Sequence, residues 1–125
     1  MLQYLKSDDS GKLTLRENLV KGSWIRCERP NEEEISQLLS LGIDADIITD
    51  ALDPHEVPRL DADNERTYLI ARLPDTDDDF NDFTTPILFV IHADYIITIS
   101  RDSLGRLWQP FIDKYVASTS SRITL

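Results

Sequence analysis

The chain has 125 residues, of which 41% are hydrophobic and 29% are charged, and its formal net charge at pH 7 is −10. This length and composition predict one folded domain and argue against a disordered chain. The negative charge argues against nucleic acid and anionic lipid as partners, because their phosphates would repel it, and favours cations or basic proteins.

The expected location is cytoplasmic. Cys27 is the one cysteine, so no internal disulfide can form. The opening segment MLQYLKSDDSGK lacks a basic region followed by a long apolar region, and the apolar runs are far shorter than a membrane span.

The first part of the chain predicts strands followed by two helices. Partial alternation of apolar residues predicts three strands, Met1–Leu5, Lys12–Leu15 and Ser23–Glu28, with SDDSG joining the first two as a hairpin. Asn31 and Glu34 have the spacing of a capping box, and Gly42 is placed to end that helix. A second short helix is expected from about Asp44 until Pro54 stops it.

The second part predicts most of a sheet. Val57–Leu60 is expected at a sheet edge, because Pro58 cannot donate to a ladder, and Thr67–Leu73 is a stronger strand. The runs PILFVI and YIITIS predict an antiparallel hairpin at the centre of the sheet, buried on both faces. Pro110 suits the first turn of a final helix. The elements predict a single mixed α/β (α+β) domain over residues 1–125.

Catalysis has little support in this sequence. A cysteine nucleophile needs a base within hydrogen-bond reach, and the candidates are His55 and His92, both in predicted turns. Cys27 lies in a predicted strand, where a buried and inert thiol is the usual case. The glycine-containing motifs of hydrolases and nucleotide-binding enzymes are absent. We therefore expect no enzyme.

The acidic run DTDDDFND is the main candidate for metal binding. Asp75, Asp77 and Asp79 have the spacing of the first ligands of an EF-hand, but Phe80 stands where that loop needs glycine and Pro86 where it needs glutamate. The run remains a set of hard oxygen donors on a predicted loop tip, comprising Asp75, Asp77, Asp78, Asp79 and Asp82. Mg²⁺ takes one or two carboxylates and keeps several waters, so such a loop could bind it weakly, especially if a neighbouring subunit supplied another acid. A solvated acidic loop without an ion is the alternative, and ligation by Asp50, Asp53, His55 and Glu56 carries less weight.

The stretch IITDALDPHEVPRLDADNERTYLIARLP resembles a segment of CorA-type magnesium and divalent-cation transporters, in which a helix ending in Asp-x-Leu leads through a turn containing histidine and proline to an apolar strand. The residues that carry the match are Asp50, Leu52, His55, Pro58, Arg59, Asp61 and Tyr68–Leu73. The hairpin ILFVIHADYIITIS and the helix around Pro110 continue it in the same order, so that the resemblance extends from about Ser23 onward.

This resemblance implies the cytoplasmic N-terminal domain of a CorA-like transporter, an α/β/α sandwich in which a mixed sheet lies between helices. The long stalk helix, the two transmembrane helices and the Gly-Met-Asn pore signature of that family are absent from the chain. The implied partners are those missing segments and further copies of the same protein, since the family forms homopentamers. The full-length protein is then expected in the plasma membrane, with this domain on its cytoplasmic face.

The resemblance also assigns a role to the acidic run. In the family, cytoplasmic Mg²⁺ binds between subunits, and one ligand is an aspartate shortly after the strand that matches Thr67–Leu73. Counting without gaps from Pro58 places this role nearest Asp77, with Asp75, Asp78 and Asp79 as substitutes. Bound Mg²⁺ would favour a closed ring, and its loss would let the facing acids repel and the pore open. The partner acid is expected on the stalk helix, so the isolated domain is expected to bind the ion poorly.

Two other hypotheses belong to different classes. A stand-alone acidic α/β domain would bind a basic protein through its carboxylates, and this binding would weaken steeply with salt. A small cysteine-dependent enzyme would require a reactive Cys27. The residues leave open which divalent ion is transported and in which direction.

Overall fold

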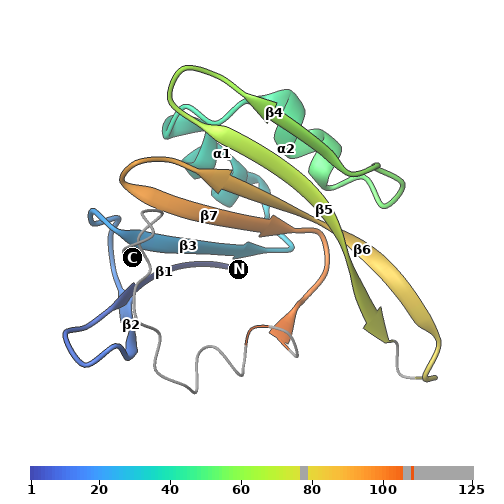
Figure 1. The fold of residues 1–125 in the computed structure, drawn as a ribbon, viewed down its shortest axis with the longest axis horizontal. Helices are drawn as coiled ribbons and strands as arrows, with labels where there is room; N and C mark the ends of the chain where they lie inside the picture. Colours follow the sequence, from blue (N-terminus) through green and yellow to red (C-terminus); the bar gives the residue numbers. More distant parts are fainter. Residues whose placement is uncertain (77–78, 106–107, 109–125) are drawn as a thin grey trace.

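The computed structural model describes residues 1–76, 79–105 and 108 of the chain. Its strands and helices are β1 (Leu2–Ser7), β2 (Leu13–Arg16), β3 (Ser23–Glu28), α1 (Glu32–Ser40), α2 (Ala45–Ala51), β4 (Arg59–Ala62), β5 (Thr67–Thr76), β6 (Asp82–Ile91) and β7 (Tyr95–Ser100). The strands form one 7-stranded sheet in the order β2-β1-β3-β7-β6-β5-β4 (Figure 1). The expected mixed α/β fold is confirmed.

The sheet consists of two antiparallel parts that meet at a parallel pair. β3 and β7 run parallel in continuous register from Ser23 opposite Tyr95 to Glu28 opposite Ser100. The other neighbouring pairs are antiparallel. The hairpin of β6 and β7 lies in the middle, as predicted, and β4 lies at one edge. A central strand can hide both faces, which agrees with the buried apolar runs of these two strands.

The helices start and stop for local reasons. The Asn31 side chain accepts from the amide of Glu34 at 2.8 Å and the Glu34 carboxylate accepts from the amide of Asn31 at 3.1 Å, which confirms the capping box. Gly42 follows α1 at a φ of +89°, a conformation that glycine adopts without a steric penalty. The Asp44 side chain accepts from the amide of Asp46 at 2.8 Å and so caps α2.

Both helices pack on one face of the sheet, where the main core lies (Figure 1). On that face Leu38, Ile48 and Ala51 of the helices meet every second residue of the central strands. These are Ile25, Cys27, Tyr68, Ile70, Leu88, Val90, Ile97 and Ile99. Full burial of a leucine or isoleucine side chain stabilises a fold by about 1.5–3 kcal/mol, so this cluster is the main apolar contribution to stability.

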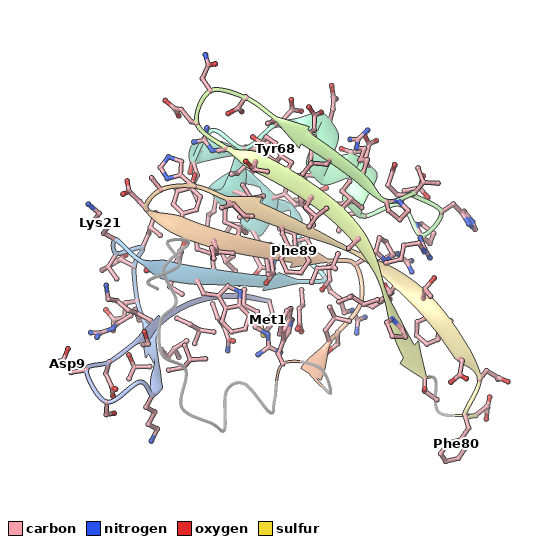
Figure 2. All side chains as sticks on the ribbon, in the orientation of Figure 1. Met1, Asp9, Lys21, Tyr68, Phe80 and Phe89 are labelled. Carbon is pink, nitrogen blue, oxygen red and sulfur yellow. The ribbon has the colours of Figure 1, made fainter. Side chains whose placement is uncertain are left out.

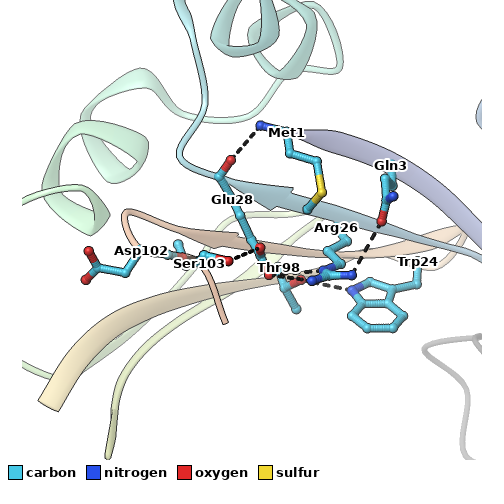
Figure 3. Close-up of polar contacts among 9 residues, drawn as sticks. Met1, Gln3, Trp24, Arg26, Glu28, Thr98, Asp102 and Ser103 are labelled. Carbon is cyan, nitrogen blue, oxygen red and sulfur yellow. Dashed lines mark hydrogen bonds and ion pairs between the residues drawn. The ribbon is translucent and has the colours of Figure 1, made fainter. Parts of the chain in front are cut away.

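The opposite face carries a buried polar cluster (Figure 3). Arg26 donates from Nε and Nη2 to Oε1 of Glu28 at 3.0 and 2.9 Å, and a weaker contact of 3.5 Å joins it to Gln3. Trp24 donates to the hydroxyl of Thr98 at 2.9 Å, and its ring meets the ring of Trp108 edge to face at a centroid distance of 5.1 Å. Within the described residues, no buried side-chain nitrogen or oxygen lacks a hydrogen-bond partner.

Strand ends differ from the predictions at several places. β1 extends two residues beyond Leu5, and β4 begins at Arg59, after Pro58. The predicted helix after Pro110 lies outside the described residues. In the part of the chain that the structure describes, no helix has both the length and the hydrophobicity of a membrane span.

Candidate functional site

The predicted acidic run lies on a hairpin arm that leaves the body of the sheet (Figure 1). β5 and β6 pair with each other without interruption from Thr67 opposite Ile91 to Thr76 opposite Asp82. β4 accompanies β5 only as far as Ile70, and β7 accompanies β6 only from Ile87. Beyond these points, no other described strand flanks the pair. We call this two-stranded part, Leu73–Thr76 with Asp82–Thr85 and the connection between them, the arm.

The arm corrects the prediction of a long acidic loop. Asp75 and Asp82 were expected in that loop, but they stand on strands, opposite Phe83 and Thr76 respectively. Aspartate and proline have low strand propensity, and this local preference predicted a loop from Asp75 onward. Pairing with the opposite strand overrides that preference, so the connection is reduced to residues 77–81.

Prolines occupy both strands of this region. Pro74 lies opposite Thr84 and Pro86 lies opposite Arg72. Proline cannot donate to a ladder and is therefore tolerated only where a strand has an open edge. A proline at an open edge also discourages another strand from adding there. The arm is thus suited to contacts through its side chains.

The tip of the arm is exposed and sharply turned. Phe80 has a φ of 62°, an uncommon conformation for a bulky residue, and 87% of its surface is exposed. Figure 2 shows it at the far end of the arm, directed away from the sheet. Asp79, beside it, is also exposed. The hydroxyl of Thr76 donates to Oδ1 of Asp82 at 3.1 Å and joins the two strands at the base of the turn.

The predicted ligand set stays a prediction. Asp77 and Asp78 lie outside the described residues, and of the four proposed ligands only Asp79 has a described side chain. No group of three or more histidine, cysteine, aspartate or glutamate side chains among the described residues is arranged to hold a metal ion. Carboxylate oxygens on an exposed arm are nevertheless the donors that suit Mg²⁺, which needs only one or two of them besides water.

The second acidic group serves the turn that precedes β4. Oδ2 of Asp50 accepts from Nη2 of Arg59 at 2.7 Å, and Oδ1 of Asp53 accepts from the amide of His55 at 2.9 Å. Asp50 therefore joins the two ends of the turn between α2 and β4, and Asp53 stabilises the backbone inside that turn.

The cysteine and the histidines lie in structural settings. Burial raises the pKa of the Cys27 thiol to about 12, and this side chain belongs to the main core. His92 stacks on Tyr95 at a centroid distance of 4.4 Å, and its Nδ1 accepts from the amide of Asp94 at 3.0 Å. His55 is exposed in the turn after α2.

One residue of the arm's base was missed by the sequence reasoning. Arg72 donates to the side chain and the carbonyl of Thr84, both at 2.8 Å, and to the carbonyls of Pro54 and Glu56, at 3.0 and 2.8 Å. The available signal was a single arginine within the apolar strand YLIARL. It connects the arm with the turn after α2.

One family model matches most of this chain, and solved structures share its fold. The family model described as "CorA-like Mg2+ transporter protein" matches residues 21–121. The complete CorA magnesium transporter of Methanocaldococcus jannaschii superposes with a TM-score of 0.70 at 23% identity, over 91% of this chain and 37% of that one. The soluble domain of CorA from the same organism gives 0.70 at 25% identity, over 97% and 48%.

A third solved structure shows the same fold at lower identity. The full-length CmaX protein superposes with a TM-score of 0.67 at 14% identity, over 95% of this chain and 41% of that chain. A search of curated protein sequences gives no significant match. This chain spans less than half the length of each of these three proteins.

Proposed function

Because the chain belongs to the CorA-like Mg²⁺ transporter family, we propose that it is the cytoplasmic, ion-sensing domain of a divalent-cation transporter. The observation that carries this proposal is the family match over residues 21–121. The whole transporter would be an integral membrane protein and a homopentamer, and this domain would act on its pore from the cytoplasmic side.

The acidic tip of the arm is the part of the domain suited to sensing. The carboxylates of the run that the structure describes, Asp79 and Asp82, are exposed, so a neighbouring subunit can reach them. Asp77 is the first choice of ligand, with Asp75, Asp78 and Asp79 as substitutes. Mg²⁺ held between one subunit's tip and an acid of the next would neutralise their charges, and at 4 Å in a medium of effective dielectric constant 20 two like charges repel by about 4 kcal/mol.

Feedback follows from this electrostatic balance. A ligand shifts a two-state equilibrium only by its difference in affinity for the two states. Mg²⁺ bridging two subunits binds the closed, symmetric ring better than a ring whose subunits have moved apart. Plentiful cytoplasmic Mg²⁺ therefore closes the pore, and scarce Mg²⁺ leaves the acids to repel and the pore to open.

The test uses the full-length transporter and the substitution Asp77→Asn, which keeps the size of the side chain and removes its charge. We expect the cytoplasmic Mg²⁺ concentration that halves transport to rise about 5-fold or more, because an allosteric coupling of this kind is typically worth 5–150-fold. Glu17→Gln is the matched control, because Glu17 is an exposed carboxylate just after β2, which is the edge strand farthest from β4 and β5.

The same measurement on the substitute positions decides among the four aspartates. If Asp77→Asn behaves like the control and Asp75→Asn, Asp78→Asn and Asp79→Asn do too, the tip is not the sensor. A native gene product that is small and remains outside the membrane fraction of fractionated cells would refute the transporter assignment itself.

A further inference from the structure

Arg72 occupies the point where the arm separates from the sheet. Along β5, Tyr68 and Ile70 face the helices and belong to the main core. Side chains of a strand alternate between its faces, so Arg72 is the next residue on that same side. α2 has ended at this level, and the turn of residues 52–58 lies beside the strand instead of a helix.

The hydrogen bonds of Arg72 join three separate segments. Nε and Nη2 donate to Thr84 of β6, which fastens the two strands of the arm to each other. Nη1 donates to the carbonyl oxygens of Pro54 and Glu56, which fastens β5 to the turn after α2. Only the planar guanidinium offers donors in both directions at once, since a lysine ammonium is a compact point charge on a flexible stem.

The turn that receives Arg72 is itself held in place. The ion pair between Asp50 and Arg59, at 2.7 Å, connects the end of α2 with the start of β4. The amide of Glu56 donates to the carbonyl of Asp53 at 3.1 Å within the turn. The two carbonyl groups therefore belong to a segment fixed at both ends, and they give Arg72 a firm attachment.

A second contact holds the arm on its other face. The hydroxyl of Thr85 donates to Oδ2 of Asp102 at 2.6 Å, and Asp102 lies just after the end of β7. β5 and β6 are thus each held by a side chain, Arg72 and Thr85, close to the level where the flanking strand, β4 or β7, no longer accompanies them.

We propose that Arg72 is the positioning residue of the acidic tip, holding the arm in one direction relative to the sheet through the turn after α2. A two-stranded hairpin without flanking strands is only marginally stable. The two hydrogen bonds to Thr84 hold its strands together at the base, and the two to the carbonyls of Pro54 and Glu56 restrict movement of the arm relative to the sheet. The relevance of this direction to ion sensing rests on the proposed function, because a bridge between subunits requires each tip to stand where the next subunit can meet it.

The first experiment needs no ion. Two cysteines are introduced for spin labels, Gln37→Cys on α1 and Phe83→Cys on the arm, both at exposed positions. Cys27 stays, because it is buried in the core. Pulsed dipolar spectroscopy then gives the distribution of distances between arm and body in the 125-residue chain and in the full transporter.

The expected result is a distribution that broadens about twofold or more in Arg72→Gln and less in Arg72→Lys, with circular dichroism unchanged, because local opening follows the loss of contacts at the base. Arg16→Gln, on the exposed edge strand β2, is the control for loss of an arginine and leaves the distribution unchanged. Thr84→Val removes only one acceptor of Arg72 and gives an intermediate width, which keeps the test available if Arg72→Gln does not fold. An unchanged width in the folded variants would overturn the proposal.

The second experiment connects direction with sensing. In the full transporter, Arg72→Gln raises the Mg²⁺ concentration for half-inhibition although every acid of the tip is present, and Arg72→Lys restores part of the response. If Asp77→Asn abolishes feedback while Arg72→Gln does not alter it, the role of Arg72 in sensing is refuted. If none of the aspartate variants alters feedback, the proposed function fails, and the distance measurement still decides whether Arg72 positions the arm.

Discussion

The buried ion pair between Arg26 and Glu28 provides the sharpest test of the energetics of this fold. The side chains are 9% and 5% exposed, and both donors of the guanidinium edge reach the same carboxylate oxygen. Removing one partner of such a pair typically costs about 3–5 kcal/mol, because the other charge stays buried without compensation. Arg26→Met keeps most of the apolar volume and leaves Glu28 with its remaining 3.4 Å contact to Ser103.

The double variant Arg26→Met with Glu28→Met should be far less damaging. Replacing both charges of a buried pair by apolar groups of similar volume is often neutral or even stabilising. We therefore expect Arg26→Met to lose about 3–5 kcal/mol and the double variant to stay within about 1 kcal/mol of the parent chain.

Urea unfolding followed by tryptophan fluorescence measures these differences, since Trp24 lies within the cluster. With a denaturant slope of about 2 kcal/mol per molar urea, the single variant lowers the midpoint by about 2 M. Glu17→Gln, at an exposed position, serves as the control. A loss below about 1 kcal/mol in the single variant, or a double variant as unstable as the single one, would refute the reasoning.

Two further predictions concern Gly42 and Cys27. Gly42→Ala should lower the free energy of unfolding by about 1–2 kcal/mol, because φ is +89° and an added Cβ would lie 3.0 Å from Nη2 of Arg66. Gly105→Ala is the control, because a Cβ there meets nothing within 4 Å. Equal melting temperatures of the two variants would contradict this account. Burial raises the pKa of the Cys27 thiol from 9.0 to about 12, so its neutral form contributes stability that is fully present below pH 9 and is lost as the pH rises towards 12. Cys27→Ala should flatten that part of the stability profile, and a mild alkylating reagent should label Cys27 only as fast as the chain unfolds; rapid labelling of the folded chain would contradict burial of the thiol.

Features governed by neighbouring residues were predictable from the sequence. Three of them depend on residues close together in the chain, so the sequence alone indicates them. These are the capping box of Asn31 and Glu34, the end of α1 just before Gly42, and the central hairpin. The family resemblance was expected to hold from about Ser23 onward, and the family match begins at residue 21. The resemblance was based on several short motifs that follow one another in the same order as in the family, and one of these motifs alone would not have identified it.

Features that depend on pairing between segments were not predictable. Asp75 and Asp82 become strand residues because they pair with Phe83 and Thr76 across the hairpin, and a run rich in aspartate does not indicate that pairing. Arg72 is similar, since its acceptors on Pro54 and Glu56 lie 18 and 16 residues away. The predicted ligands at the tip were placed by analogy with a family, and their assignment still depends on the transport measurement.

The parallel pairing of β3 with β7 has a consequence for the order of folding. Ser23 and Tyr95 are partners, and the whole of both helices and three strands lies between them in the chain. β1, β2 and β3 can form a three-stranded antiparallel sheet with β1 in the middle as soon as they leave the ribosome, but they cannot join the rest of the sheet until β7 has been made. Non-local pairings of this kind slow folding, because loop closure costs entropy before the contacts compensate for it. A nascent chain that stalls before Tyr95 should therefore expose the inner edge of β3, and this is the stage at which we expect the protein to depend most on chaperones.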